Sequence, residues 1–580
     1  MKETIFRIVD REEKICSDFI NLSGENLVKI DFKELDFTAL FLDSKKRVQE
    51  EYVKILEKIA QNFKLEYAID STLLEKNTNN RSFFKYLLVL YCLKKIKDER
   101  EIITFFVKPN SVFTKIIRNN QKLLEQNLNV TIEYDLKRSI LDYRLNLNLF
   151  FLRLGKIGLY FIRKILLSVL YNNDLKNRNI KFIDFFWVTS FNSKNLHNVF
   201  SPDINNTISK NYIEEERLNL ISCQNLTSLP TICKDKDVII LDAYVRFWDI
   251  VYLIKRAYKL SRVSCDYKFC QLNIKDLLHQ ELINDRFNTN ILLYLGFKNL
   301  FKKIKKENLG QPLVFYPFEN QAFENRICFE ARRNELQTVA IQHSIITDDH
   351  FKIRKLDFYN EHQVYPDLIV SNSDLFCEEL INYNQTRSKI MALKSQRYAR
   401  FYGSSEVPGY AARESIDNVL VLFPLIEEGI LALACELGAL KMARSRFIFR
   451  FHPYTTEKLR RRIIGLCNNL NVSISTHNSL LEAISDAESV CTTSTSAYLD
   501  AIYDGKPVFY LRSKFGIDFV INDNFIRSKL VFGTNVDDLE KFLYTVHGHS
   551  NNVSLKETRA YMANKFGSGL SVEEFFEKYG

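Results

Sequence analysis

The stretch RFIFRFHPY at residues 446–454 places a titratable ring directly after an apolar run. The apolar part predicts a buried strand, and His452 and Pro453 follow where that strand ends. An imidazole in this position can donate a hydrogen bond to a phosphate oxygen and exchange a proton near neutral pH. Proline ends the strand ladder and stiffens the turn that presents the ring. Arg450, on the same strand face, could add a cation. The alternative is a strand-end histidine satisfied by backbone groups.

A second group of candidate residues is the hydroxyl cluster in CTTSTSAYLDAIYDGKPV, residues 491–508. The pattern predicts that Ser494, Thr495 and Ser496 lie at the N-terminus of a helix, where unpaired backbone N–H groups and hydroxyls attract anions. Ordinary capping would need only one hydroxyl, so the cluster favours an anion site. Asp500, further into the same helix, could orient the hydroxyls or contact the ligand.

A third group lies in NVLVLFPLIEEGI, residues 418–430, where a predicted strand leads into a helix that starts near Glu427, Glu428 and Gly429. Acidic residues favour helix N-termini in any case, because they complement the helix dipole. The functional alternative is a general base, or a contact to a nucleoside, that faces the same site.

Two further strand ends carry acid/base candidates. FYPFENQAFENRI ends a strand and opens a helix with Glu319 and Glu324, and VAIQHS ends the next strand with His343. Adjacent strand ends that present carboxylates and an imidazole form a plausible acid/base constellation. Glu330 is expected on a solvated helix face. Asp348, Asp349 and His350 would serve a metal only with further ligands, which the sequence does not reveal.

The elements that must position these residues alternate between short apolar strands and longer amphipathic helices. Continuously apolar strands separated by helices indicate parallel sheets covered on both faces, in an α/β fold. The predicted strands cover residues 100–109, 129–136, 179–191, 237–245, 312–318, 337–344, 366–373, 418–425, 446–453, 471–477, 488–496 and 506–513. We expect two Rossmann-like domains that face a cleft, with ligands at the carboxyl ends of the strands.

The domain boundaries follow from composition. Residues 401–417 are rich in Gly, Ser and Pro and are interpreted as a linker. It separates an N-terminal Rossmann-like domain (1–400) from a C-terminal Rossmann-like domain (418–545). A helical tail (546–580) contains SVEEFFEKYG, in which Ser571 and Glu574 have the spacing of a capping box.

Composition limits the class of protein and its location. The 580 residues exceed one hydrophobic core, and the net charge of +10 suits a phosphate-bearing substrate or an anionic membrane surface. Eleven cysteines without a CxxC pair argue against structural zinc, and no signal peptide is apparent. No nucleic-acid-binding module is recognisable. A cytoplasmic location is therefore expected.

The segment 147–171 combines apolar residues with four cations, and no stretch of the chain reaches 18 uninterrupted apolar residues. The segment is either a helix lying in a membrane interface or an amphipathic helix packed on the core of the protein. The first alternative would make the protein peripheral on the inner face of the cytoplasmic membrane. Its cations are Arg153, Lys156, Arg163 and Lys164.

The combination of a strand ending in His-Pro with the later TSTSAYLDAIYDGKPV resembles the donor half of GT-B glycosyltransferases that build bacterial surface polysaccharides. The similar families include the CMP-sugar-using sialyl-, polysialyl- and Kdo-transferases and, more loosely, CDP-glycerol and CDP-ribitol phosphotransferases. YPFENQAFENRI followed by VAIQHS resembles the acceptor-side signature of a group of surface carbohydrate biosynthesis proteins. The resemblance covers residues 312–530.

The resemblance implies a metal-independent transferase without a cofactor. It would move a 3-deoxy-ulosonic acid, such as Kdo or a sialic-type nonulosonate, from CMP to a capsule, O-antigen or lipooligosaccharide glycan. His452 would contact the CMP phosphate, Ser494, Thr495 and Ser496 the donor phosphate or carboxylate, and Glu427 would be the base. VAIQHS lacks the Gly of the commoner QHG form, so the base stays open among Glu427, Glu319, Glu324 and His343. The alternatives are a CDP-polyol phosphotransferase and a non-catalytic GT-B scaffold.

Overall fold

A computed structural model describes most of the chain. The described residues are 4–9, 19–21, 27–31, 37–71, 73–75, 82–95, 103–106, 119–120, 122, 130–135, 155, 158, 162, 166–167, 171, 179–188, 217–223, 238–263, 266–286, 288, 290–307, 309, 311–319, 321–342, 344–347, 353–395, 397–402, 418–425, 427–440, 445–512, 518–545 and 552–579.

The C-terminal part of the chain forms a six-stranded sheet in which all neighbours run parallel. Numbered in chain order, its strands lie in the order 3-2-1-4-5-6, which is the order of the Rossmann fold. From edge to edge they are β17 (Asn471–Ile474), β16 (Arg446–Arg450), β15 (Asn418–Leu422), β18 (Ser489–Thr492), β19 (Val508–Leu511) and β20 (Leu530–Gly533).

Helices cover both faces of this sheet because its strands are apolar on both sides. In β15, Val419 and Val421 belong to one buried cluster, while Leu420 and Leu422 belong to another. The first cluster includes residues of α15 (Glu427–Gly438), α16 (Glu457–Leu466) and α20 (Val536–Thr545). The second includes residues of α17 (Leu480–Asp486), α18 (Tyr498–Tyr503) and α19 (Asn524–Arg527).

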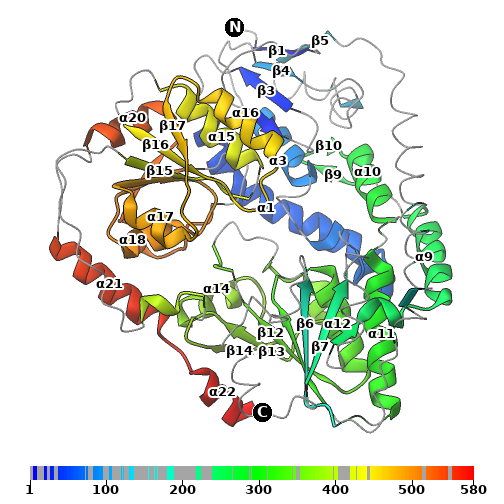
Figure 1. Cartoon of the computed structure of the whole chain (residues 1–580). Coiled ribbons are helices and arrows are strands. Elements are labelled where there is room, and N and C mark those ends of the chain that lie inside the picture. The colour runs from blue at the N-terminus through cyan, green and yellow to red at the C-terminus, as the bar shows by residue number, and fades with distance from the viewer. Residues whose placement is uncertain are drawn as a thin grey trace.

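A second parallel sheet lies earlier in the chain (Figure 1). Its order, 7-6-5-4-1-2-3 in chain numbering, is the same Rossmann order extended by one strand. The strands are β14 (Lys389–Ala392), β13 (Leu368–Ser371), β12 (Gln337–Ile341), β11 (Leu313–Pro317), β6 (Phe182–Val188), β7 (Arg217–Cys223) and β8 (Val238–Ile240).

One face of this sheet packs on helices of its own domain, and the other on the end of the chain. Phe182 and Phe315 contact Phe576 of the last helix, whereas Phe185 of β6 contacts Phe297 and Phe323 on the opposite face. The helices and short strands after β8 are η4 (Leu241–Tyr244), α9 (Phe247–Leu260), β9 (Lys268–Phe269), β10 (Leu272–Asn273), α10 (Lys275–Arg286), α11 (Asn290–Glu307), α12 (Ala322–Arg333), α13 (Asp357–Glu361), η6 (Asp374–Phe376), α14 (Cys377–Asn382) and η7 (Ala399–Phe401).

The N-terminal residues add a third sheet that we did not anticipate as a separate unit within the range 1–400. It has the order β2-β3-β4-β1-β5 and mixes parallel and antiparallel pairs. Its strands and the helices beside it are β1 (Thr4–Val9), β2 (Phe19–Asn21), β3 (Leu27–Asp31), β4 (Ile103–Phe106), β5 (Val130–Asp135), α1 (Phe37–Gln61), α2 (Leu65–Ala68), η1 (Leu73–Glu75) and α3 (Ser82–Lys95).

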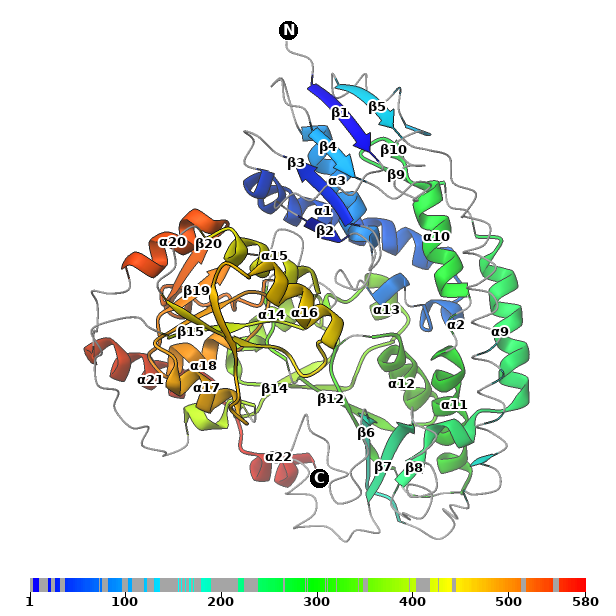
Figure 2. The same ribbon diagram turned by 45° about the horizontal axis from the view of Figure 1, so that its top comes forward.

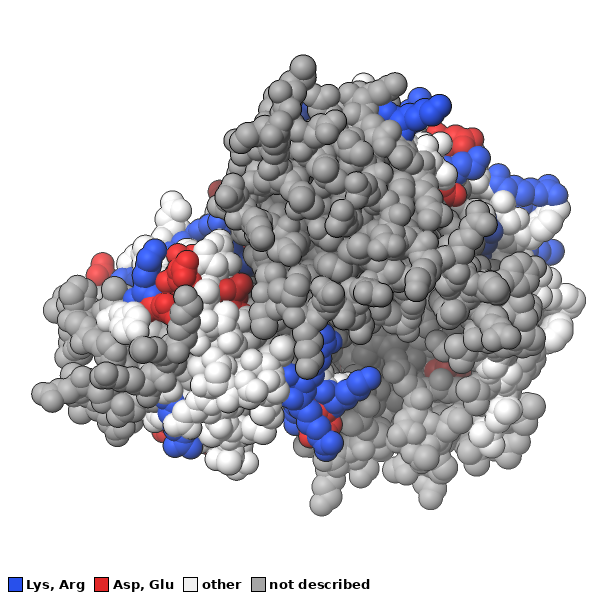
Figure 3. Space-filling model, turned by 90° about the horizontal axis from the view of Figure 1, so that it is seen from above, with Lys and Arg blue, Asp and Glu red and all other residues white. Residues whose placement is uncertain are grey.

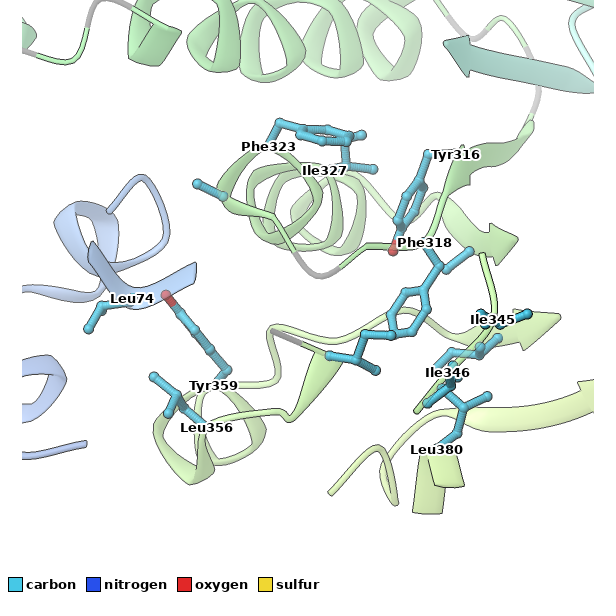
Figure 4. Close-up of a cluster of buried hydrophobic side chains, with 14 of the residues drawn as sticks. Leu74, Tyr316, Phe318, Phe323, Ile327, Ile345, Ile346, Leu356, Tyr359 and Leu380 are labelled. Carbon is cyan, nitrogen blue, oxygen red and sulfur yellow. The ribbon is translucent and has the colours of Figure 1, made fainter. Parts of the chain in front are cut away.

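The N-terminal helices share a core with the first Rossmann-like sheet. Leu74 of η1 lies beside Tyr359 and Leu356, and the cluster continues past Phe318 to Ile346 (Figure 4). A buried ion pair crosses the same contact. Arg326 of α12 bonds to Asp70 (2.5 Å) and to Glu330 (2.7 Å). The prediction that Glu330 lies on a solvated helix face was therefore wrong, because Glu330 neutralises a buried guanidinium.

The chain end returns from the second Rossmann-like domain to the first (Figure 1). Helix α21 (Asn552–Phe566) contacts α18, and α22 (Val572–Tyr579) packs on the sheet of the first domain. At the start of α22 the Ser571 N–H donates to the Glu574 carboxylate (2.6 Å), and the Glu574 N–H donates to the Ser571 hydroxyl (3.2 Å). The predicted capping box is confirmed.

The structure confirms the predicted α/β class with two Rossmann-like domains. Phe401, placed at the start of the predicted linker, is buried and stacks on Tyr398 and Tyr503; residues 403–417 lie outside the described residues. Most of the segment 147–171 also lies outside them. Within the described part of the chain, no helix combines the length and apolar character needed to cross a membrane.

Candidate functional site

The carboxyl ends of β16, β15 and β18 form the candidate site, because the chain leaves β15 and β18 in opposite directions at this edge. Leu422 is paired with Arg450 on one side and with Thr492 on the other, so the three strands end level. His452 and Ser494 each follow two residues beyond that line. Strands lie about 4.8 Å apart, so the two outer strand ends are separated by roughly 10 Å.

Ser494 has a backbone conformation that few residues adopt. Its φ of +43° lies in the left-handed region, where the backbone of any residue other than glycine is strained. The Tyr510 hydroxyl holds the turn by accepting the Ser494 N–H (3.0 Å) and the Phe519 N–H (2.9 Å). Tyr510 itself is fully buried. Such strain persists only where surrounding contacts enforce it, and it is frequent at functional turns.

Helix α15 begins close to this turn. A Cβ at Gly429 would lie 3.0 Å from the Pro424 ring and 3.5 Å from the Ser494 hydroxyl. The glycine therefore lets the first turn of α15 approach Ser494, and its positive dipole end comes with it. Gly429 was predicted in the donor site, and the structure brings it to Ser494. Glu427 and Glu428 begin this helix, and their side chains lie outside the described residues.

The hydroxyl groups at the end of β18 and just after it differ in their hydrogen-bond partners. Thr492 and Thr493 donate to strand-end carbonyls, those of Leu422 (3.0 Å) and Leu511 (2.7 Å), so they tie the sheet edge together. The Thr495 hydroxyl accepts the Ala497 N–H (3.3 Å).

The predicted place of this cluster needs a correction. Helix α18 starts only at Tyr498, and its N-cap is Ala497, without a side-chain cap. Ser494, Thr495 and Ser496 therefore form a turn before the helix rather than its N-terminus. The helix N-terminus that approaches this turn is that of α15.

A hydrogen bond to one ring nitrogen of His452 determines where the neutral ring carries its proton. Its Nδ1 accepts the Tyr454 N–H (3.3 Å), so the proton of the neutral ring is on Nε2. Burial lowers the pKa of His452 from its ordinary value, which favours this neutral form. The Thr455 N–H donates to the His452 carbonyl (2.9 Å) and closes a turn in which Pro453 is exposed. His452 is thus set up as an Nε2–H donor.

Arg450 does not act beside His452 as we predicted. Its guanidinium donates to the Ser475 hydroxyl (3.3 Å) and to the carbonyls of His477 (2.9 Å) and Asn478 (3.5 Å). These acceptors belong to the loop after β17. The guanidinium of Arg450 is therefore engaged in holding the neighbouring loop.

Two arginines from the first domain reach the second, and sequence reasoning missed both. Arg397 Nη2 donates to the Ser496 hydroxyl (3.1 Å), and Arg400 bonds to Asp500 (2.8 Å) and Asp504 (3.2 Å). Burial raises the pKa of the Asp500 carboxyl, and the Arg400 guanidinium opposes that rise. Asp500 therefore joins the domains instead of orienting the hydroxyls. No local sequence pattern marks these partners, which lie about 100 residues apart.

Glu319 and Glu324 lie at the equivalent edge of the first sheet, just after β11, which neighbours β6. One Glu324 oxygen accepts the N–H groups of Glu319 (2.9 Å) and Gln321 (3.1 Å), so this buried carboxylate caps α12. Glu319 is half-buried and accepts a hydrogen bond from the Gln321 amide. The geometry leaves Glu319 better placed than Glu324 for acid/base chemistry.

The remaining candidates of this domain are His343, Asp348, Asp349 and His350, and all four lie outside the described residues. Gln342, beside His343, accepts hydrogen bonds from Ser371 (3.2 Å) and Asn372 (3.1 Å) and is structural. Across the described residues, no three His, Cys, Asp or Glu side chains gather as metal ligands would. Metal independence stays a prediction.

No protein-family model matches the chain, and no curated protein matches it. Solved structures match at low identity. The calicheamicin glycosyltransferase CalG4 is similar over 69% of this chain and 97% of its own, with 11% identity and a TM-score of 0.38. UDP-GlcNAc 2-epimerase from Neisseria meningitidis is similar over 69% and 99%, with 10% identity and a TM-score of 0.37. MurG from Acinetobacter baumannii shows 6% identity over 69% and 98%, with a TM-score of 0.33.

Proposed function

We propose that the chain is a glycosyltransferase of GT-B type. It would take a CMP-activated 3-deoxy-ulosonic acid, of the Kdo or sialic type, and transfer the sugar to a bacterial surface glycan. The capsule, O-antigen and lipooligosaccharide are the acceptor classes that the resemblance implies. The donor would bind in the second Rossmann-like domain and the acceptor at the first.

The observation that carries this proposal is the strained turn at Ser494, with α15 beside it and His452 across the edge of β15. A helix N-terminus attracts phosphate, and so does an N–H donor such as the Nε2 of a neutral imidazole. The start of α15 and the ring of His452 both lie outside the carboxyl ends of the strands, where doubly wound sheets bind their ligands.

In the proposed reaction the acceptor hydroxyl oxygen attacks the anomeric carbon, and the bond from this carbon to the CMP phosphate oxygen breaks. CMP leaves with the electron pair, and His452 Nε2–H and the start of α15 stabilise the charge on its phosphate. A carboxylate takes the proton of the acceptor hydroxyl if the reaction inverts. We assign this base to Glu319, because Glu324 is engaged in capping.

The test is a donor panel. CMP, CDP, UDP and GDP are added separately, and the melting temperature is measured; a bound product raises it by mass action. We expect CMP to give the largest rise, and His452→Ala to remove that rise. Turnover of CMP-Kdo and CMP-sialic acid is then assayed against lipooligosaccharide acceptors. Turnover of a UDP-linked sugar with none from any CMP-sugar would overturn the donor assignment.

The alternatives give different outcomes in the same assays. A CDP-polyol phosphotransferase would transfer radiolabelled phosphate, rather than sugar, from donor to product. A non-catalytic scaffold would leave the cellular glycan unchanged when His452→Ala replaces the wild-type chain. Loss of the glycan with His452→Ala, and retention of the phosphate label in CMP, is the result that the proposal requires.

A further inference from the structure

Helix α9 exposes large apolar side chains along one face. Phe247 is 62% exposed, Trp248 72%, Ile254 65% and Tyr258 54%. They are one, six and four residues apart along the chain. At about 100° per residue, all four therefore lie within about 120° on one side of the helix. Scattered exposed apolar residues are ordinary on protein surfaces, but a contiguous row that includes Trp and Phe marks an interaction site.

The opposite face of α9 is buried, and it holds one acidic and one basic side chain beside Leu253 and Leu260. Arg256 pairs with Asp285 (2.8 Å), and both side chains are fully buried. Asp249, the single acidic residue of the helix, is buried and accepts a hydrogen bond from the Asn299 amide (2.9 Å). A surface helix in contact only with water turns its apolar stripe toward the core, whereas α9 has apolar side chains on both its buried and its exposed face.

The exposed row is interleaved with cations. Lys255 and Lys259 lie beside Ile254 and Tyr258 and are exposed, and the Arg262 guanidinium stacks on the Tyr258 ring (4.3 Å from its centre). Because Asp249 points inward, the outer face of the helix combines apolar bulk with positive charge alone. Long cationic side chains next to Trp and Tyr rings are the composition of a helix that lies in a membrane interface.

A second exposed apolar pair lies earlier in the chain, before Tyr171. Ile162 is 54% exposed and Leu166 39%, four residues apart. The same stretch is tied to β8, since the Tyr171 hydroxyl donates to the Val238 carbonyl (3.1 Å) and accepts the Ile240 N–H (3.3 Å). Strand β8 leads through η4 directly into α9.

The position of α9 leaves this face accessible. Figures 1 and 2 both show the helix along the outer edge of the molecule, on the side away from the second Rossmann-like domain. Among the described residues, Figure 3 shows Lys and Arg side chains at the right-hand edge of the molecule. This is the side on which Figure 1 places α9 and α10.

We propose that the exposed face of α9, formed by Phe247, Trp248, Ile254, Lys255, Tyr258 and Lys259, binds the surface of a bilayer that contains anionic phospholipids. The apolar side chains enter the boundary between headgroups and acyl chains, while the lysines pair with lipid phosphates. The inference concerns a surface distinct from the candidate site and does not rest on the proposed donor.

Flotation of the full chain with vesicles tests the proposal. We expect binding to vesicles of phosphatidylcholine with phosphatidylglycerol, and much weaker binding to phosphatidylcholine alone. Lys255→Gln with Lys259→Gln removes two cations, each worth roughly a fivefold factor near an anionic surface, so the partition coefficient should fall by roughly 25-fold. Phe247→Ser with Trp248→Ser should reduce binding to both kinds of vesicle.

The matched control is Tyr544→Ser with Lys541→Gln on α20, where the residues are also exposed but lie in the other domain. We expect this variant to bind as the wild type does. Equal binding by the α9 variants, or no flotation of the wild type with any vesicle, overturns the proposal. The second outcome would leave a protein partner as the occupant of the face.

Tryptophan fluorescence gives a second measurement of membrane binding, in which the residues of the α9 face are left unchanged. The chain has two tryptophans, Trp187 and Trp248, so Trp187→Phe leaves Trp248 as the reporter. Addition of anionic vesicles should shift its emission to the blue, and lipids brominated near the headgroup should quench it. An unshifted, unquenched emission under conditions where the protein floats would show that another surface binds, and would overturn the role of α9.

Discussion

The two Rossmann-like sheets share one strand order but hold different chemistry at the same edge. In the second domain, the strand ends carry an imidazole, a strained serine turn and the start of a twelve-residue helix. In the first domain, the equivalent edge carries Glu319 and Glu324. One edge therefore offers hydrogen-bond donors and a positive dipole, whereas the other offers carboxylates.

Under the proposed function, this difference would divide the transfer reaction between the two sheet edges. Donors of hydrogen bonds suit a departing phosphate, and a carboxylate suits an acceptor hydroxyl. The fold alone would not distinguish the two edges, because function is set by the side chains at the strand ends. Substitutions at each edge should therefore give different kinetic effects.

The largest effect is expected at the second domain. His452→Ala removes the Nε2–H donor, and kcat for transfer should fall by about 100–1,000-fold, as for loss of one preorganised donor. The control is His477→Ala on the neighbouring loop, whose ring pairs with Asp486 (3.1 Å) and should leave kcat unchanged. An equal fall of kcat in the two variants would show that this edge needs only intact loops and no Nε2–H donor. The proposed difference between the two sheet edges would then be wrong.

At the first domain, Glu319→Gln should lower kcat by about 100-fold, the lower range for a general base, with little change in stability. Glu324→Gln is its matched partner. Losing the charged cap should lower the free energy of unfolding by about 1–2 kcal/mol, with kcat of the folded enzyme unchanged. Denaturant unfolding and steady-state kinetics of both variants separate the roles; a reversed pattern would exchange the two assignments.

A smaller effect should follow from Gly429→Ala. The added Cβ would meet the Pro424 ring at 3.0 Å and shift the start of α15 by a few tenths of an ångström. Transfer should fall by about tenfold, since misplacement of donors is costly. Gly465→Ala on α16 is the control, because a Cβ there meets nothing within 4 Å and should stabilise the helix by about 0.5–1 kcal/mol. Unchanged transfer in Gly429→Ala would remove α15 from the site.

The smallest effect concerns pH. Burial holds the pKa of His452 below its unfolded value of about 6.5. As the pH falls below that value, the unfolded chain takes up a proton that folded His452 does not, so the free energy of unfolding decreases. Between the folded and the unfolded pKa of His452, the free energy of unfolding of His452→Gln should therefore depend less steeply on pH than that of the wild type. A His452 NMR titration with a pKa above 6.5 would contradict the buried, neutral ring.

Much of the fold was predictable because continuously apolar runs identify strands buried on both faces. The strands at 312–318, 418–425 and 446–453 were placed correctly, and so was the capping box at Ser571. Three strands of these sheets were missed. Strands β14 and β20 have four residues each and lie at sheet edges, and β7 (RLNLISC) mixes polar with apolar residues. In the N-terminal sheet, β4 and β5 fall within the predicted strands 100–109 and 129–136, whereas β1, β2 and β3 were missed.

The candidate site was predictable in kind but not in detail. A histidine after a strand and hydroxyls before a helix are local patterns, and the structure places both groups at the carboxyl edge of the second sheet, as predicted from the sequence. The partners of Arg450, Asp500 and Ser496 could not be found this way, because each partner lies on a different segment of the chain. Side-chain direction at a strand end is decided by packing, which sequence spacing does not specify.

By itself, the sequence determined the periodicities, and therefore the two doubly wound sheets and the residues at their carboxyl ends. Only the tertiary structure decided that Gly429 meets Ser494, that Arg397 and Arg400 join the domains, and that α9 turns its aromatic face outward. The physical reason is that hydrophobic periodicity is a local property. Contacts between distant segments depend on how whole elements pack, and burial selects among faces that the local pattern leaves equivalent.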